Sequence, residues 1–166
     1  MKLKGGAHKY GADVNTDMII PARWLHNDDR TLWVEHCMED IDTEFSKRLK
    51  PGDFIVATTN FGCGSSREQA PIVIKEAGVA GVIASSFARI FFRNAINIGL
   101  PILECPEAAE ATQMGDELDV DLSTGTIRNL SKDKTYHAQP FPDFMRGIIE
   151  MGGLIAYTRE RFKGKR

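Results

Sequence analysis

Short apolar runs alternate with amphipathic stretches through the middle of the chain. The run DFIVAT (53–58) has the length and apolar content of a buried strand. The next stretch predicts a helix over 67–77, which Gly78 ends, and VAGVIA (79–84) predicts another strand. A strand, a helix and a strand within about 30 residues form a βαβ unit. We therefore expect these two strands to be parallel.

A second helix and a third strand extend this pattern. The helix is predicted over 87–97 and ends at Gly99, and LPILE (100–104) is the apolar strand that follows. This helix and this strand continue the alternation of strand and helix in the first unit. The middle of the chain therefore predicts parallel strands covered by helices.

The pattern changes beyond Gly115. ELDVDL (117–122) alternates apolar and polar residues, and TIRNL (126–130) follows a turn at Ser123-Thr124-Gly125. Two alternating runs joined by a short glycine-containing turn indicate an antiparallel hairpin. Parallel and antiparallel strands are thus expected in one α/β domain that spans residues 1–166, with no repeat or linker.

The remaining elements are predicted from weaker patterns. Met18–Ile20 suggests a short strand that Pro21 stops. Helical segments are expected at 31–38, at 41–50 before the turn Pro51-Gly52, at 142–151, and at 154–162.

Composition narrows the classes of function. The formal net charge is −2, hydrophobic residues make up 42% and charged residues 27% of the 166 residues, which is typical of a globular domain. The balance of charge argues against nucleic-acid binding, and the basic run RFKGKR (161–166) is interpreted as a solvated tail. No apolar run approaches the ~20 residues of a membrane span, and the N-terminus lacks the apolar region of a signal peptide.

The cysteines provide neither a disulfide framework nor a metal site. Cys37, Cys63 and Cys105 are odd in number and widely spaced, without a CxxC pair. This usage favours a reducing compartment, the cytoplasm, and predicts no metal held by this chain.

The stretch NFGCGSSREQAP (60–71) joins the first predicted strand to its helix and has two interpretations. Glycines suit a tight turn, and Ser65 with Glu68, or Ser66 with Gln69, has the spacing of a capping box. The same geometry, however, presents backbone N–H groups to an anion. Arg67 is unfavourable for a first helical turn but suited to gripping a carboxylate in bidentate fashion.

Other uses of this stretch are less well supported. The phosphate loop GxxxxGK[ST], the dinucleotide motif GxGxxG and the nucleophile elbow GxSxG are all absent. Cys63 has the position of a nucleophile near a helix N-terminus, but a small buried packing residue is the more common role. No other cysteine or histidine lies within metal-ligand spacing of it.

Three segments together resemble a known family. GADVNTDMIIPARWL (11–25), NFGCGSSREQAP (60–71) and SSFARIFFRNAINIGLPILE (85–104) are similar to the small subunits of aconitase-type hydro-lyases, most closely those that act on isopropylmalate. The resemblance extends from about residue 6 to about residue 157 with order and spacing preserved. It implies the three-layer β/β/α swivelling domain that closes over the active site of aconitase.

The resemblance also implies a division of labour between two chains. In the family a large subunit carries the 4Fe–4S cluster, whose open iron acts as a Lewis acid on the substrate hydroxyl and carboxylate. Carried over to this sequence, Ser65 corresponds to the base that removes the carbon-bound proton, Ser66 to a substrate hydrogen-bonding group, and Arg67 to the carboxylate clamp. The implied substrate is a small di- or tricarboxylate.

The segment ARWLHNDD (22–29) resembles the family's substrate-specificity loop but departs from its usual patterns. Relatives acting on isopropylmalate place apolar residues after the leucine, and those acting on homoaconitate place an arginine there. This chain has His26 and Asn27 instead, with Arg23 upstream. Arg23 and His26 are candidate substrate contacts, and an incidental surface loop is the alternative. A homoaconitase or methylmalate-type dehydratase therefore remains open, as does a non-catalytic anion-binding module.

The other two family segments are less specific. Asn15-Thr16-Asp17 is either a capped turn or part of the site. In SSFARIFFRN, Ser86 is a candidate N-cap, and Phe87, Ile90 and Phe91 are predicted to form a buried helix face. Arg89 and Arg93 receive no role from the sequence.

Overall fold

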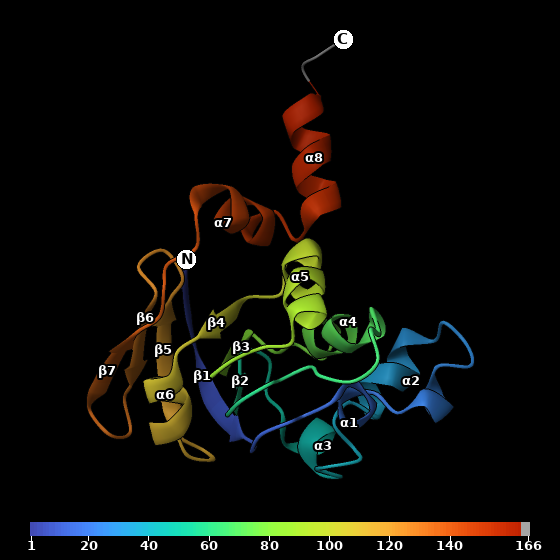
Figure 1. The fold of residues 1–166 in the computed structure, drawn as a ribbon, viewed down its shortest axis with the longest axis horizontal. Helices are drawn as coiled ribbons and strands as arrows, with labels where there is room; N and C mark the ends of the chain where they lie inside the picture. The colour runs from blue at the N-terminus through green and yellow to red at the C-terminus, as the bar shows by residue number, and fades with distance from the viewer. Residues whose placement is uncertain (164–166) are drawn as a thin grey trace.

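The computed structural model describes residues 1–163; of the predicted basic tail, 164–166 lie outside the described residues. One seven-stranded sheet in the order β4-β3-β2-β1-β5-β6-β7 runs through it (Figure 1). The strands are β1 Lys2–Lys9, β2 Phe54–Ala57, β3 Gly81–Ala84, β4 Ile102–Glu104, β5 Glu117–Asp121, β6 Thr126–Asn129 and β7 Lys134–His137.

Strand β1 joins an antiparallel half of the sheet to a parallel half. The N-terminal part of β1 pairs antiparallel with β5, from Lys2 opposite Asp121 to Gly6 opposite Glu117. Its C-terminal part pairs parallel with β2, from Ala7 opposite Phe54 onward. Strands β2, β3 and β4 continue the parallel half, and β5, β6 and β7 continue the antiparallel half.

Two glycines occupy the point where β1 changes partner. A Cβ added at Gly5 would lie 2.2 Å from the carbonyl oxygen of Gly52, so only glycine fits against that backbone. The N–H of Gly6 donates to Asp53 Oδ1 at 2.8 Å. The turn before β2 is thereby held against the middle of β1.

The helices complete the layers of the fold. They are α1 Thr16–Ile19, the 3₁₀ turn η1 Ala22–Trp24, α2 Arg30–Glu35, α3 Phe45–Arg48, α4 Gln69–Glu76, α5 Arg89–Ile98, α6 Pro106–Ala111, α7 Asp143–Glu150 and α8 Leu154–Phe162. α4 packs on α5, and α6 contacts β2 and β3. In Figure 1, α8 extends away from the rest of the chain. None of the described helices is long and apolar enough to cross a membrane.

The three family-like segments all leave the same edge of the sheet. Residues 10–17 follow the carboxyl end of β1, 58–68 follow β2, and 85–88 follow β3. These strands are parallel neighbours in the order β3-β2-β1, so their carboxyl ends lie side by side. Open α/β sheets bind ligands at such an edge.

The predicted fold class is confirmed. The structure is α/β, with the parallel βαβ unit β2-α4-β3 and the antiparallel hairpin β5-β6 where the sequence predicted them. The two halves of the curled sheet and the helices correspond to the expected β/β/α arrangement.

Several local predictions were wrong or incomplete. Met18 and Ile19 belong to α1 rather than to a strand, because Asn15 caps that helix by accepting the Met18 N–H at 2.9 Å. Strand β1 was not predicted, since its residues KLKGGAHK lack a clean alternation. The short elements α6 and β7 were also missed.

The contact between Gly5 and Gly52 provides a test of the fold. Gly5→Ala places a methyl group inside the backbone of the neighbouring turn, so we expect it to lower the free energy of unfolding by at least about 2 kcal/mol. Gly11→Ala is the matched control, because nothing lies within 4 Å of a Cβ there. Urea denaturation of both variants measures the difference, and equal stabilities would contradict the proposed close approach.

Candidate active site

The segment 60–68 is hydrogen-bonded on both sides to the other two family-like segments. On one side the Gly62 N–H donates to Val14 O at 2.8 Å, and the Thr16 N–H donates to Cys63 O at 2.9 Å. On the other side the Phe61 N–H donates to Ser86 O at 3.0 Å. The loop that carries the serines is therefore fixed by backbone contacts to residues far away in the sequence.

Gly62 sets how closely this loop approaches α5. It has φ +80°, and a Cβ there would lie 2.2 Å from Cγ and 2.5 Å from Cβ of Phe91. The Phe91 ring also packs edge-to-face on Phe61, with centroids 5.2 Å apart. Because the clash involves the base of the Phe91 side chain, the ring cannot swing away from a larger residue.

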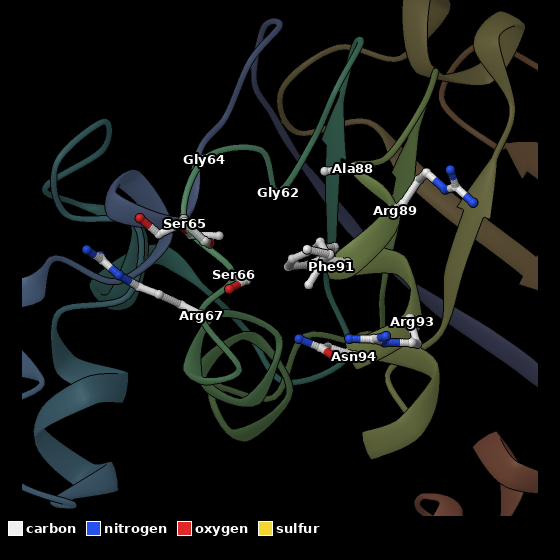
Figure 2. A pocket seen from close by; sticks show the side chains of 12 residues that line it. Gly62, Gly64, Ser65, Ser66, Arg67, Ala88, Arg89, Phe91, Arg93 and Asn94 are labelled. Atoms are coloured by element: carbon white, nitrogen blue, oxygen red, sulfur yellow. The ribbon is translucent and has the colours of Figure 1, made fainter.

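A pocket of about 700 Å³ opens between the loop and the start of α5 (Figure 2). None of its lining residues is acidic, so its charged groups are all cationic. The lining residues are Thr16, Gly62, Gly64, Ser65, Ser66, Arg67, Ala88, Arg89, Ile90, Phe91, Arg93 and Asn94.

Ser65 and Ser66 present free hydroxyl groups at this pocket. Both residues are exposed, and neither hydroxyl has a hydrogen-bond partner within residues 1–163. The backbone of Ser65 is held instead: its carbonyl accepts from Thr16 Oγ1 at 2.8 Å and from the Arg67 N–H at 2.8 Å. The main chain is thus anchored while the side chains remain available to a ligand.

Arg67 lines the pocket but is engaged by the neighbouring segment. Its Nη1 donates to Ile20 O at 3.0 Å and lies 2.6 Å from Asp17 Oδ1. Figure 2 shows the guanidinium directed away from Phe91. Its charge is therefore partly neutralised in this chain by a carboxylate.

The capping predictions for this region were wrong. Helix α4 begins at Gln69 with Glu68 as N-cap and no side-chain cap bond, so neither serine forms a capping box. The backbone of 60–66 is instead bound to 13–16 and 86–88, which leaves Arg67 ahead of the helix rather than in its first turn. Ser86 does not cap α5 either, because its hydroxyl accepts the Asn60 N–H at 2.9 Å and Ala88 is the N-cap.

Cys63 shows none of the features of an activated thiol. It is half-buried rather than buried as predicted, and it does not line the pocket. Partial burial and the nearby Asp13 carboxylate raise its pKa. A raised pKa lowers the thiolate fraction, so Cys63 is unsuited to nucleophilic attack.

The other wall of the pocket comes from the first turns of α5. Arg89 and Arg93 are four residues apart and therefore share one helix face. Ile90 is 46% exposed and does not join the buried face predicted for it, whereas Phe87 and Phe91 are buried. The sequence assigned Arg89 and Arg93 no role. Their spacing could have indicated one, because like charges four residues apart destabilise a helix and therefore suggest a use other than stability.

The structure does not bring Arg23 and His26 into this pocket. Arg23 Nη2 lies 2.7 Å from Asp40 Oδ1 and also contacts Glu39. His26 Nδ1 donates to Arg23 O at 2.9 Å. Asp40 and Glu39 raise the pKa of Arg23 above its already high value. Both residues are exposed, and substrate contact by either stays a prediction.

An aromatic cluster holds the residues next to Arg23 in place. The Trp24 ring stacks on His36 with centroids 3.6 Å apart and an interplanar angle of 5°. Trp24 Nε1 donates to Glu39 Oε1 at 2.7 Å. Burial alone would raise the pKa of Glu39, but hydrogen bonds from Trp24, His36 and Arg23 outweigh it and lower the pKa.

The described residues offer no set of side chains for a metal ion or an iron–sulfur cluster. No group of three or more His, Cys, Asp or Glu side chains converges within 1–163. All three cysteines are free, and Cys37 and Cys105 are buried apart from the pocket. A cluster ligated by cysteines therefore does not fit this chain.

Comparisons with known proteins agree on one family. The model of the aconitase C-terminal domain matches residues 9–108. The chain is 60% identical to the 3-isopropylmalate dehydratase small subunit of Clostridium beijerinckii, over 97% of this chain and 100% of that one. It is 57% identical to the 2,3-dimethylmalate dehydratase small subunit of Eubacterium barkeri, over 95% and 96%.

A solved structure supports the same relationship. The crystal structure of 3-isopropylmalate dehydratase from Methanocaldococcus jannaschii superimposes with a TM-score of 0.92 at 46% identity, covering 97% of this chain and 95% of that one. The resemblance that the three sequence segments indicated is thereby confirmed.

The approach of Gly62 to Phe91 predicts a large effect of a single methyl group. Gly62→Ala combines a positive φ with a clash, so we expect it to reduce the free energy of unfolding by at least about 1 kcal/mol more than Gly115→Ala does. Gly115 is the control because it has φ +84° but nothing within 4 Å of an added Cβ. Urea denaturation of the two variants measures the difference, and equal losses would refute the packing described here.

Proposed function

Because this chain belongs to the family of 3-isopropylmalate dehydratase small subunits, we propose that it interconverts 2-isopropylmalate and 3-isopropylmalate by dehydration and rehydration in leucine biosynthesis, together with a large subunit. Membership in this aconitase-type family makes it a hydro-lyase subunit. One observation carries the proposal for the site: two unpartnered serine hydroxyls and Arg67 line an open, cationic pocket at the carboxyl edge of the parallel strands.

Ser65 is the proposed base that removes the carbon-bound proton. A serine hydroxyl becomes a competent base only if its alkoxide is stabilised. The pocket supplies positive charge from the arginines and contains no carboxylate among its lining residues. Backbone N–H groups of the serines, unpartnered in the described chain, add further donors for a negatively charged oxygen.

Ser66 and Arg67 are the proposed substrate-binding groups beside this base. Ser66 faces the pocket in Figure 2, where its hydroxyl is placed to hydrogen-bond a substrate oxygen. Arg67 binds a substrate carboxylate, and Asp17 holds its guanidinium in place. Arg23 and His26 are retained as proposed specificity residues, and their role requires the segment 22–29 to approach the pocket.

The reaction needs a second chain in this proposal. Relatives of this chain are named as small subunits, which implies a large subunit as partner. We place the 4Fe–4S cluster on that large subunit, where it supplies Lewis-acid chemistry, in a heterodimer or heterotetramer. Residues 1–166 act as one swivelling domain that closes over the shared site in the cytoplasm, a location consistent with three free cysteines.

A second substrate class is supported by one specific comparison. The small subunit named for 2,3-dimethylmalate is 57% identical to this chain, close to the 60% found for an isopropylmalate relative. Both names denote malates with apolar substituents, one isopropyl group in the first relative's substrate and two methyl groups in the second's. Overall identity therefore does not separate them, and a smaller substituted malate is the alternative.

Reconstitution tests the division between the two chains. The purified chain alone is expected to contain no stoichiometric iron and to show no dehydratase activity. Mixing it with its large subunit, isolated with an intact cluster, should produce isopropylmalate isomerisation. Comparing isopropylmalate, dimethylmalate, homocitrate and citramalate as substrates then measures specificity. Iron or activity in the isolated chain would disprove the proposed assignment.

Ser65→Ala tests the proposed base. We expect kcat of the reconstituted complex to fall by about 10²- to 10⁴-fold, the usual contribution of general acid–base catalysis. Folding should remain intact, because the Ser65 hydroxyl has no partner among the described residues. Cys63→Ala is the control in the same loop and should leave kcat little changed. A severe effect at Cys63 with a mild one at Ser65 would reverse the assignment.

A further inference from the structure

We infer that Arg93 and Asn94, on α5, form a second carboxylate-binding subsite in the pocket, opposite Ser66. The inference rests on the proposed function for the identity of the substrate, a dicarboxylate. It assigns binding to a wall of the pocket that the sequence motifs left without a role.

The charges in the pocket are the first reason for this subsite. Arg67 already has a carboxylate, Asp17, at 2.6 Å and a carbonyl, Ile20, at 3.0 Å. The side chains of Arg89 and Arg93, in contrast, form no ion pair or hydrogen bond within the described part of the chain. A pocket with unneutralised guanidinium groups and no acidic lining residue attracts an anion.

The direction of the side chains distinguishes Arg93 from the other arginines. In Figure 2, Arg93 and Asn94, which both line the pocket, extend from α5 in the direction of the wall that carries Ser66. Arg67 turns away and pairs with Asp17 on α1, and Arg89 turns away on the opposite side in the same view. Arg93 is thus the arginine whose guanidinium faces the space between the two walls.

The local chemistry suits a carboxylate. A guanidinium offers paired N–H donors that match the two oxygens of a carboxylate, and the Asn94 amide offers a further donor beside it. The first turn of α5 opens onto the same pocket without a side-chain cap, which adds favourable electrostatics for an anion.

Two subsites match the chemistry of the proposed substrate. Isopropylmalate carries two carboxylates, and two separate cationic groups can hold both of them at once. With one carboxylate at Arg93, the other is left for Arg67, whose guanidinium must turn from Asp17 toward the pocket to meet it. The carbon skeleton would then span the pocket beside Ser65 and Ser66. Holding both ends of the substrate fixes its orientation toward the base.

A binding experiment on the isolated chain tests the subsite without reference to activity. The chain is titrated with malonate, a small dicarboxylate, and the side-chain amide signals of Asn94 are followed by ¹⁵N NMR. We expect saturable shifts that become at least about tenfold weaker in affinity in Arg93→Met, since a charge-assisted pair is lost. Arg128→Met, on β6 and outside the pocket, is the control and should bind malonate as wild type does. Equal malonate affinity in Arg93→Met and wild type would overturn the inference.

Kinetics of the reconstituted complex show whether Arg93 acts in substrate binding or in contact with the large subunit. Arg93→Met should raise KM for isopropylmalate at least about tenfold, with a smaller change in kcat, and Arg93→Lys should recover part of the loss. Asn94→Asp, which has the same shape, should also raise KM by repelling the carboxylate. The affinity for the large subunit should stay unchanged. Weaker subunit association with unaltered malonate binding would assign Arg93 to an interface and overturn the subsite.

The outcomes also separate this inference from the proposed function. An inactive wild-type complex on isopropylmalate would reject the proposed substrate, while malonate binding through Arg93 would still support the subsite. An active complex whose KM is insensitive to Arg93→Met would support the function and reject the subsite.

Discussion

The backbone hydrogen bonds that join residues 60–63 to 13–16 and 86–88 are the constraint on which the site depends. They fasten three loops that leave neighbouring parallel strands, so that segments far apart in the sequence form one continuous surface. Gly62 completes this arrangement, because any side chain there would collide with Phe91. The serines are consequently placed by main-chain contacts, and their hydroxyls are spared for a ligand. For the proposed base, Ser65, such main-chain support would reduce the reorganisation needed during reaction.

The same hydrogen bonds explain why the helix-capping interpretation of the serines was wrong, whereas their functional interpretation stays a prediction. A capping box satisfies the first N–H groups of a helix with local side chains. In this structure the chain before α4 is held by long-range pairing, and the helix begins only at Gln69. A local spacing rule cannot include hydrogen-bond partners that lie about 25 to 50 residues away in the sequence. The motif was therefore recognisable from sequence, but the reason for its conformation was not.

The elements of the fold that could be predicted are likewise those with local signals in the sequence. Strands β2 and β3 with α4 between them follow from apolar runs and a terminal glycine, which are local signals. Strand β1 lacks such a signal because it changes from antiparallel to parallel pairing at Gly5-Gly6 and contacts a different partner at each end. Asn15, in contrast, was recognised as a possible cap, yet the helix it caps was taken for a strand. Whether such a segment forms a helix or a strand depends on its packing against distant residues, and the spacing of residues in the sequence does not reveal that packing.

The two arginines Arg67 and Arg93 differ in how firmly the structure holds their charges. Asp17 and the Ile20 carbonyl hold Arg67 in one orientation, at the cost of part of its attraction for a second carboxylate. Arg93 is exposed and has no acidic partner among the described residues, so its full charge is available but its position is less restrained. In the proposed complex with a dicarboxylate, Arg67 would define the geometry of one carboxylate and Arg93 would add attraction for the other. No group of metal-ligating side chains lies beside these arginines within residues 1–163, which accords with the proposal that the large subunit supplies the cluster.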